Sequence, residues 1–473
     1  MKRYFLLFAT ALSIGVLSSC SDDKDNNVTP PTTGDDVVVL KGDITANKTL
    51  TADKKYLLDG FVYVKSGATL TIEPGTVIMG DKADKGTLII TRGAKIEAKG
   101  TAAKPIVFTS SQPKGARSQG DWGGVIILGK AKTNATDGEA KIEGGLVPTA
   151  GGAEKEYIWY GGTNDTDNSG TLEYVRIEFA GIAYSPDNEI NGLTMGGVGN
   201  GTKISYVQVY RSGDDAFEWF GGSVNCDHLV ATYTWDDDFD TDNGFSGKVQ
   251  FGVAHRYKAI ADVSGSNGFE SDNDANGSVN APQTKAIFSN MTIVGPIVAG
   301  NSNSGINANF QHGAQIRRNS SMSLVNSLIV GFPIGLYIDD SKVASHKTSQ
   351  NAAEGSLMFK NNIIAGANPS TITKSEWSTQ DPVAWAAWWA ATNTTVLAKA
   401  EEALMTTPNV FSPAVGATTG TPNFLLKAES PAVTGGMDVT TLGFVKAEYR
   451  GAFDATTDWT KGWTNWAAES TEY

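Results

Sequence analysis

Carboxylates recur in three neighbouring segments of this 473-residue chain, each time beside an aromatic residue. Phe217, Phe239 and Phe269 are each followed directly by a carboxylate. We call the carboxylates of these segments the acidic ladder: Asp214, Asp215, Glu218, Asp236, Asp237, Asp238, Asp240, Asp242, Glu270, Asp272 and Asp274. Two unit charges about 5 Å apart repel by roughly 3 kcal/mol at an effective dielectric constant of about 20. Carboxylates that stack at this spacing therefore need a proton or a bound cation.

Calcium is the cation that suits such a group of oxygens best. Ca²⁺ accepts about six to eight oxygen ligands in flexible geometry. The predicted ligands come from all three segments: Asp215, Glu218, Asp237, Asp240, Asp242, Glu270 and Asp272. The Asp-rich segment 236–243 lacks the Gly and Glu positions of an EF-hand loop. The alternative to a calcium site is a solvated acidic face between strands.

The spacing of these segments predicts a coil that brings them into register. With Tyr206, His228 and Lys258 set in one column, the laps are 22 and 30 residues long, and an aromatic residue follows each column position after eleven residues. A return every 20 to 30 residues or so is typical of stacked repeat proteins. In a β-solenoid, equivalent positions of adjacent laps lie about 4.8 Å apart. We therefore expect the phenylalanines to stack inside and the carboxylates outside.

Strand-like segments continue on both sides of the ladder. Runs of Ile, Val and Leu alternate with polar residues and with turns that contain some of the 53 glycines. This spacing is also compatible with a β-sandwich. Asn290, Asn326 and Asn361 begin three later repeats, where we expect a ladder of side-chain hydrogen bonds. His228 shares their column, so a structural role is expected for it as well.

A polar, Gly-rich stretch interrupts the repeats at residues 133–168 and predicts a long loop insertion. Its aromatic residues Tyr157, Trp159 and Tyr160 form either a sugar-stacking platform or packing contacts with the coil. These alternatives differ in one observable, the exposure of the rings.

A helical insertion is predicted at residues 375–406. Trp385, Trp388 and Trp389 occur there at helical spacing, and an Ala-rich run follows them. The segment either caps the open end of the coil, where exposed strands invite aggregation, or presents a surface to a partner.

The N-terminus has the pattern of an export signal followed by a tether. Residues 1–19 combine a basic start with an apolar run that is too short to span a bilayer. Their end, together with Cys20, resembles a bacterial lipobox, which implies a lipoprotein signal peptide and a lipidated Cys20. Residues 20–36 are polar and predict a flexible tether.

Several motifs resemble a family of secreted Bacteroidota proteins with right-handed parallel β-helices. They are GATLTIEPGT at 67–76, KPIVFTS at 104–110 and GDWGG at 120–124. The resemblance covers roughly residues 37–470 and implies this all-β fold for a domain over residues 37–473. The acidic residues after Cys20 are similar to the tag that sends such lipoproteins to the outer face of the outer membrane. The resemblance also implies a TonB-dependent transporter complex as a partner, because many members lie beside such systems.

The chain also resembles carbohydrate-active β-helix enzymes in part. Pectate lyases place Asp-bound Ca²⁺ beside an Arg or Lys base, and Arg211, Arg256 and Lys258 lie near the ladder in the sequence. The acid–base motifs of polygalacturonases occur here only partly and in a different order. The candidate catalytic residues are therefore Asp214, Asp215, Asp237, Arg211, Arg256 and Lys258.

Composition excludes one class of partner and leaves three classes of function. The formal net charge of −13 argues against nucleic acid, because an acidic protein repels phosphates. The favoured function is non-catalytic binding of a glycan or another ligand at the cell surface, beside a TonB-dependent uptake system. The first alternative is a Ca²⁺-dependent polysaccharide lyase or a glycoside hydrolase. The second is a structural or adhesive surface protein.

Overall fold

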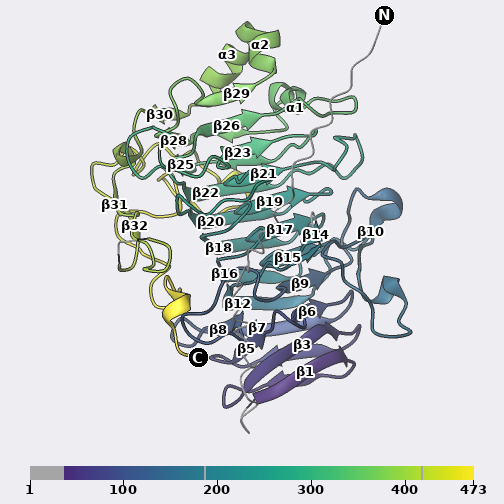
Figure 1. Cartoon of the computed structure of the whole chain (residues 1–473). Coiled ribbons are helices and arrows are strands. Elements are labelled where there is room, and N and C mark those ends of the chain that lie inside the picture. The colour runs from purple at the N-terminus through teal and green to yellow at the C-terminus, as the bar shows by residue number, and fades with distance from the viewer. Residues whose placement is uncertain (1–36, 186–187, 417–418) are drawn as a thin grey trace, which may run out of the picture.

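The computed structural model describes residues 37–185, 188–416 and 419–473. The expected signal peptide (1–19), Cys20 and the expected tether (20–36) lie outside the described residues. The chain winds into a parallel β-helix, whose laps rise from β1 (Val37–Ile44) to β30 (Thr395–Leu397) (Figure 1). This confirms the predicted all-β solenoid. Within the described ranges, no helix is long and apolar enough to cross a membrane.

The β-helix has three faces, which we call A, B and C. Face A contains β2 (Lys48–Leu50), β4 (Thr69–Ile72), β7 (Lys95–Lys99), the first halves of β12 (Gly170–Glu178), β16 (Lys203–Tyr210), β18 (Asn225–Thr232), β20 (Lys248–His255) and β22 (Ile287–Val294), then β24 (Ser323–Val325) and β27 (Phe359–Lys360). Face B contains the first halves of β1 and β3 (Lys55–Val64), then β5 (Val77–Gly80), β8 (Ile106–Ser110), the second halves of β12 to β22, β25 (Leu328–Val330), β28 (Ile363–Ala365) and β30.

Face C carries the acidic ladder. It contains the second halves of β1 and β3, then β6 (Thr87–Ile90), β9 (Val125–Leu128), β15 (Leu193–Gly196), β17 (Phe217–Phe220), β19 (Phe239–Asp242), β21 (Phe269–Ser271), β23 (His312–Ile316), β26 (Ile334–Ile338) and β29 (Thr373–Ser375). Every pairing on this face is parallel, so equivalent residues of successive laps stand side by side, about 4.8 Å apart.

Phe217, Phe239 and Phe269 stack inside the coil, as predicted. The strand registers pair the first with the second and the second with the third. Their ring centroids are 5.7 and 5.3 Å apart, and all three side chains are fully buried. Successive side chains of a strand point to opposite sides. The carboxylate that follows each phenylalanine therefore points outward, which aligns the acidic ladder on one face.

The corner between faces A and B is made by one residue per lap in the left-handed region of φ. These residues are Tyr174, Tyr206, His228, Phe251, Asn290, Asn326 and Asn361, with φ between +51° and +62°. Asn tolerates this region better than most residues do. The aromatic members stack instead, and the rings of Tyr206 and His228 lie 4.2 Å apart. The structural role expected for His228 is confirmed.

One column assignment was wrong. His228 is followed at the corner by Phe251, and the strand pairings on both sides fix this register. The predicted successor, Lys258, lies on an exposed loop after β20. Phe251 precedes Phe269 by 18 residues, whereas His228 precedes Phe239 by 11. The extra residues of the longer lap therefore lie after the corner residue Phe251. The column of Tyr206, His228 and Lys258 had instead placed them before the corner.

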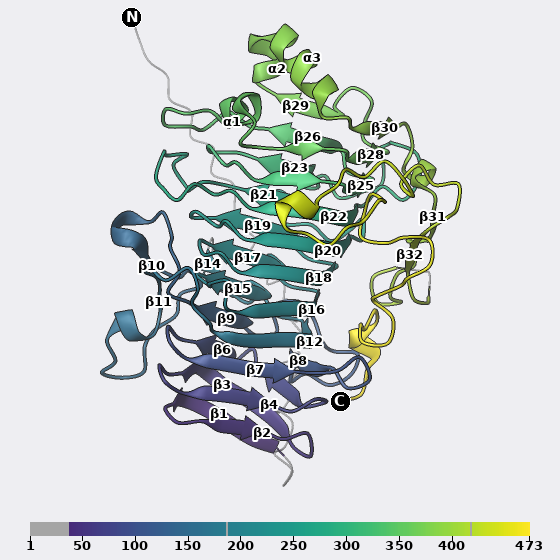
Figure 2. The ribbon, with the colours of Figure 1, turned by 180° about the vertical axis from the view of Figure 1, so that it is seen from behind.

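A C-terminal tail, residues 427–473, runs back along the flank of the coil toward its N-terminal end (Figure 2). The Nδ2 groups of Asn290, Asn326 and Asn361 donate to tail carbonyl oxygens at 2.8 to 2.9 Å. We expected these asparagines to form a ladder of side-chain hydrogen bonds. This prediction was wrong, because their side-chain amides bind backbone carbonyls of the tail. The asparagines stack in register, but they use their amides to hold the tail.

Asn326 binds the tail most completely, and its loss should be measurable. Its side chain donates to the carbonyl of Met437 and accepts from the N–H of the same residue, each at 2.8 Å. Asn326→Ala should lower the free energy of unfolding by about 2 kcal/mol, since two hydrogen bonds are lost and Ala disfavours positive φ. Urea denaturation measures this. Asn326→Gly loses only the hydrogen bonds, so it should lower the free energy of unfolding by less. If Asn326→Ala has the same free energy of unfolding as the unsubstituted protein, the role assigned to the tail contacts is wrong.

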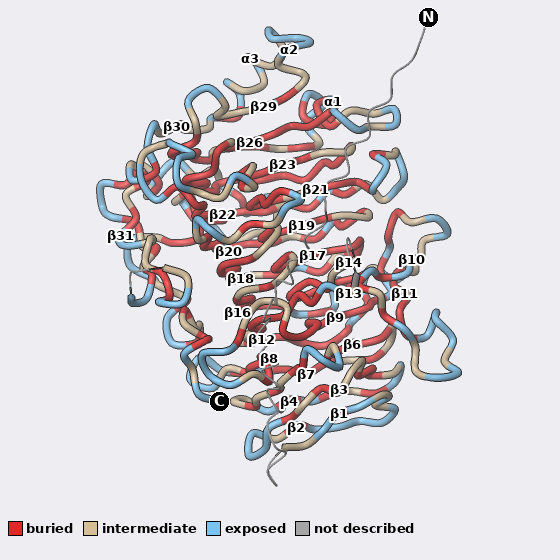
Figure 3. The backbone as a smooth tube through the Cα atoms, viewed as in Figure 1, coloured by how far each residue is buried: buried red, intermediate tan, exposed pale blue. Residues whose placement is uncertain are grey.

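The insertion at 133–168 packs against the coil. It contains the strand pair β10 (Glu139–Lys141) and β11 (Trp159–Gly161). Tyr157 and Tyr160 are buried, only 6% and 2% exposed. Figure 3 shows that the part of the chain around β10 and β11 includes buried stretches. The ring of Tyr157 lies 4.9 Å from that of Tyr63 of β3. The packing interpretation of these aromatics is confirmed, and the sugar-platform alternative was wrong for both tyrosines.

Helices lie at the end of the coil farthest from β1 (Figure 1). They are α1 (Thr348–Glu354), α2 (Trp377–Gln380) and α3 (Pro382–Ala391). Trp385, Trp388 and Trp389 pack, half-buried, against the core at this end. After α3 the chain returns to face B as β30, and a short 3-10 helix, η3 (Ala400–Ala403), follows; the α-helical part of the segment 375–406 therefore ends at Ala391.

Candidate functional site

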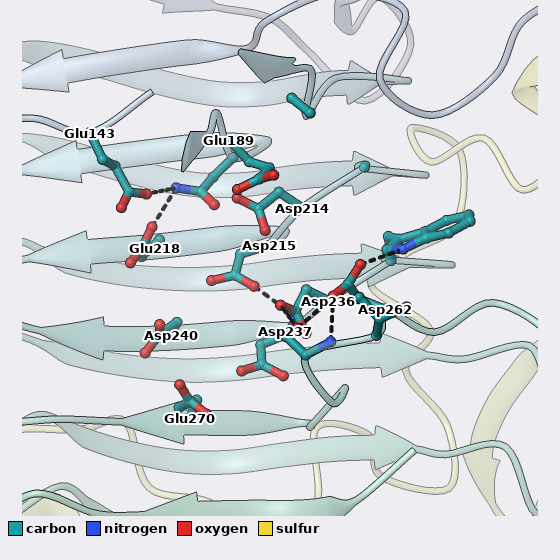
Figure 4. A pocket seen from close by; sticks show the side chains of 16 residues that line it. Glu143, Glu189, Asp214, Asp215, Glu218, Asp236, Asp237, Asp240, Asp262 and Glu270 are labelled. Atoms are coloured by element: carbon teal, nitrogen blue, oxygen red, sulfur yellow. Dashed lines mark hydrogen bonds between the residues drawn. The ribbon is translucent and has the colours of Figure 1, made fainter. Parts of the chain in front are cut away.

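A cleft of about 580 Å³ lies over face C, above β17, β19 and β21. Ten carboxylates line it (Figure 4): Glu143, Glu189, Asp214, Asp215, Glu218, Asp236, Asp237, Asp240, Asp262 and Glu270. Among the described residues of this lining, there is no Lys, Arg or His. The cleft therefore attracts cations and repels anions.

The floor of the cleft is set by strand register. Glu218 of β17 pairs with Asp240 of β19, and Asp240 pairs with Glu270 of β21. Each follows a buried phenylalanine, so each points outward for the reason given above. The three carboxylates form one column with about 4.8 Å between successive backbones.

A second column of acids comes from the turns that precede these strands. Asp215 Oδ1 accepts the backbone N–H of Asp237 at 2.7 Å. Asp237 Oδ1 in turn accepts the backbone N–H of Asn267 at 2.5 Å, and Asn267 Oδ1 accepts that of His312 at 3.1 Å. Each side chain thus links its lap to the next. Part of the acidic pattern is therefore structural, since these carboxylates satisfy backbone donors that strand pairing leaves free.

Two groups of carboxylates are close enough to share a cation. Asp214, Asp215 and Asp236 each offer an oxygen within 4.8 Å of the others, and so do Asp215, Glu218 and Asp240. Asp215 belongs to both groups. All these donors are carboxylate oxygens, the ligand type that Ca²⁺ prefers.

Asn191 supplies a further oxygen beside these groups. Its Nδ2 donates to Glu143 at 3.2 Å and to Glu218, while its Oδ1 has no hydrogen-bond partner although the residue is only 1% exposed. A buried carbonyl oxygen without a donor is costly, and a cation would satisfy it. The residues present therefore fit a calcium ion.

Burial and mutual repulsion raise the pKa of the cleft carboxyls. Five carboxyls have a pKa well above the usual range, and burial is the main cause, followed by repulsion from neighbouring carboxylates. They are Asp214, Asp215, Glu218, Asp237 and Asp240. Burial raises the pKa of Asp236 to about 6, and it raises that of Glu270 to about 8 despite the attraction of Arg317. Without a cation, the Glu270 carboxyl therefore carries a proton near neutral pH, and a cation bound there must displace it.

The three basic candidates lie outside the cleft lining. Arg211 donates to Gln119 Oε1 at 2.7 Å. Arg256 is fully buried and pairs with Asp238 at 2.8 Å. Lys258 is exposed on the loop after β20. None of the three is placed to take a proton from a ligand in the cleft.

Arg317, which follows β23, supplies positive charge at the edge of the ladder. Its guanidinium pairs with Glu270 and, at 2.8 Å, with Asp272, which Arg318 also contacts.

Asp272 and Asp242, both predicted calcium ligands, do not line the cleft. The other predicted ligands, Asp215, Glu218, Asp237, Asp240 and Glu270, do line it, as do the catalytic candidates Asp214, Asp215 and Asp237.

Loops contribute residues that the repeat pattern did not reveal. Glu143 comes from the insertion at 133–168, and Asp262 from the long loop after β20. Trp235 lies half-buried at the rim, with its indole N–H donated to Asp262 Oδ1 at 2.8 Å. These residues lie outside the repeating positions, so periodicity carried no signal for them.

Fold and cleft together define a β-helix protein with an acidic site on one parallel face. The family model for the pectate-lyase-like β-helix domain matches residues 42–406, and the chain belongs to that family. The fold of this family includes lyases and binding proteins, so membership does not assign a reaction.

Two chains of known structure match the fold. One is the crystal structure of pectate lyase Pel9A, with 13% sequence identity, a TM-score of 0.32 and coverage of 83% of this chain and 88% of that one. No curated protein matches the chain.

Proposed function

We propose that the cleft binds Ca²⁺ and, through it, a glycan, without cleaving the glycan. The observation that carries this is the pair of carboxylate groups that share Asp215 in a cleft whose described lining has no basic residue. Such a cleft repels an acidic ligand by itself. A bound Ca²⁺ supplies the missing positive charge and keeps coordination positions for ligand oxygens.

The rim of the cleft supports a sugar ring as the ligand. Trp235 is half-exposed there, and its hydrogen bond to Asp262 fixes the plane of the indole. Val263, next to Asp262 in the lining, is 89% exposed. An aromatic face beside polar oxygens suits a ring with one apolar side and several hydroxyls.

The placement of the basic residues argues against cleavage by a lyase. A lyase of the calcium-dependent type needs an Arg or Lys base, and Arg211, Arg256 and Lys258 are all turned to other partners or to solvent. Hydrolysis is the second candidate, because a carboxyl such as Asp236, with its pKa raised to about 6, is suited to donate a proton. Release of reducing ends from a bound glycan would favour that candidate.

The N-terminal resemblance supports a location at the cell surface. A lipidated Cys20 would anchor the protein to the outer membrane, and the tether 20–36 would hold the β-helix off the surface. In this setting the cleft would capture glycan at the cell surface for a TonB-dependent uptake complex.

A glycan array probed with and without Ca²⁺ tests the proposal. Binding should require Ca²⁺, should disappear with EDTA, and should leave the glycan uncleaved. Trp235→Ala should weaken binding about tenfold, since ring stacking contributes about 1 kcal/mol or more beyond burial. Trp388→Ala, a half-buried tryptophan at the far end of the coil, is the matched control. Equal glycan binding in EDTA would refute the calcium-bridged mode.

A further inference from the structure

A second cavity of about 570 Å³ lies on face C, one strand beyond the acidic cleft. Gln315 of β23 lines it and pairs in register with Glu270 of β21, which lines the cleft. The two cavities therefore adjoin along the coil axis. The walls of the second cavity come from β23, β26 and β29 and from the segments around them.

The second cavity has an apolar wall and a cation. Phe310, Pro333 and Ile334 form the apolar part. The ammonium group of Lys374 lies 4.0 Å above the ring of Tyr337. Lys374 is exposed, and no carboxylate of the described residues forms an ion pair with it. This positive charge is held over an aromatic ring and remains available to an anion.

Two hydrogen-bond acceptors complete the lining. His312 Nδ1 lies 2.8 Å from Asn267 Oδ1, an oxygen that also accepts the backbone N–H of His312 at 3.1 Å. Nδ1 therefore carries the proton, and Nε2 of the neutral ring is an acceptor. The Asp339 carboxylate is fixed by Gln315 at 2.9 Å and by the backbone N–H of Ser341 at 2.7 Å.

We propose that this cavity is a separate binding site for a hydroxylated ring that carries one anionic group, a carboxylate or a sulfate. The ring would lie against Pro333 and Ile334, its hydroxyls would donate to His312 and Asp339, and its anionic group would pair with Lys374. A cavity with an apolar wall and a few fixed polar groups is typical of small-ligand sites. The site uses the protein's own cation, so it works without Ca²⁺ and does not depend on the function proposed for the acidic cleft.

Ligand-detected NMR titration in EDTA tests this site with three probes: glucuronate, glucose 6-sulfate and glucose. The two anionic sugars should bind with a Kd on the order of 1 mM, and glucose should bind about tenfold more weakly, because a charge-assisted hydrogen bond is missing. Lys374→Met should weaken the anionic sugars about tenfold and leave glucose unchanged. Lys374→Arg should retain most of the binding, since it keeps the charge.

The control is Lys461→Met, which removes an exposed lysine from the tail and should change nothing. The proposal is overturned if Lys374→Met binds glucuronate as well as the unsubstituted protein does, or if glucose binds as tightly as the anionic sugars. It is also overturned if the anionic sugars bind only with Ca²⁺ and lose binding in Asp215→Asn, because the ligand would then occupy the acidic cleft. That last result would support the proposed function and reject only this second site.

Discussion

Asp215→Asn should abolish most Ca²⁺ binding and, at the same time, make the metal-free protein more stable. Asp215 is the carboxylate that both candidate groups share, so its loss removes a ligand and a negative charge from each. We expect Ca²⁺ affinity to fall about 100-fold. The metal-free protein should gain about 1 to 2 kcal/mol of unfolding free energy, because folding no longer requires this carboxyl either to take up a proton or to be buried as a charge.

The asparagine keeps the structural contact, which makes the substitution interpretable. Its Oδ1 can still accept the backbone N–H of Asp237, as Asp215 Oδ1 does at 2.7 Å. Isothermal titration calorimetry gives the Ca²⁺ affinity, and urea denaturation in EDTA gives the stability. Asp242→Asn is the matched control, because Asp242 belongs to the ladder but does not line the cleft. Equal Ca²⁺ affinity in Asp215→Asn and the unsubstituted protein would remove the basis for the site.

The column of phenylalanines shows what periodicity can predict. Phe217, Phe239 and Phe269 sit at equivalent strand positions, and inward packing requires an apolar residue at each lap. The outward carboxylates followed from strand alternation alone. The core and the floor of the cleft were therefore predictable, because both are fixed by local repeats.

The parts that were missed depend on contacts between segments far apart in the sequence. Lys258 was misplaced because a lap can lengthen at any corner without changing its core residues. Asn326 binds Met437, which lies 111 residues away, and no repeat pattern marks the path of the tail. Glu143 reaches the cleft from an insertion, and the pairing of Arg317 with Glu270 joins residues 47 positions apart. The positions of insertions and of the arginines that pair with the ladder depend on the folded coil, so the repeat pattern does not predict them.

The metal-free protein should lose stability as the pH rises from about 5 to about 8, and Ca²⁺ should remove most of this loss. Folding raises the pKa of Asp236 from 3.8 to about 6 and that of Glu270 from 4.5 to about 8. Between the unfolded and folded pKa values the native state binds more protons than the unfolded state. This stabilisation is fully present below the unfolded pKa and is lost as the pH rises through the folded pKa.

The expected loss across this window is on the order of a few kcal/mol, measured by urea denaturation in EDTA at a series of pH values. Ca²⁺ stabilises the ionised carboxylates, so its affinity should rise with pH and flatten the profile. Glu270→Gln should lessen the decline between about pH 6 and pH 8, because folding raises the pKa of this carboxyl to about 8. Asp438→Asn, at a fully exposed carboxyl in the tail, should leave the profile unchanged. A metal-free protein that becomes more stable between pH 5 and pH 8 would show that the cleft carboxyls are ionised without a cation, and the physical reason for a calcium site would be lost.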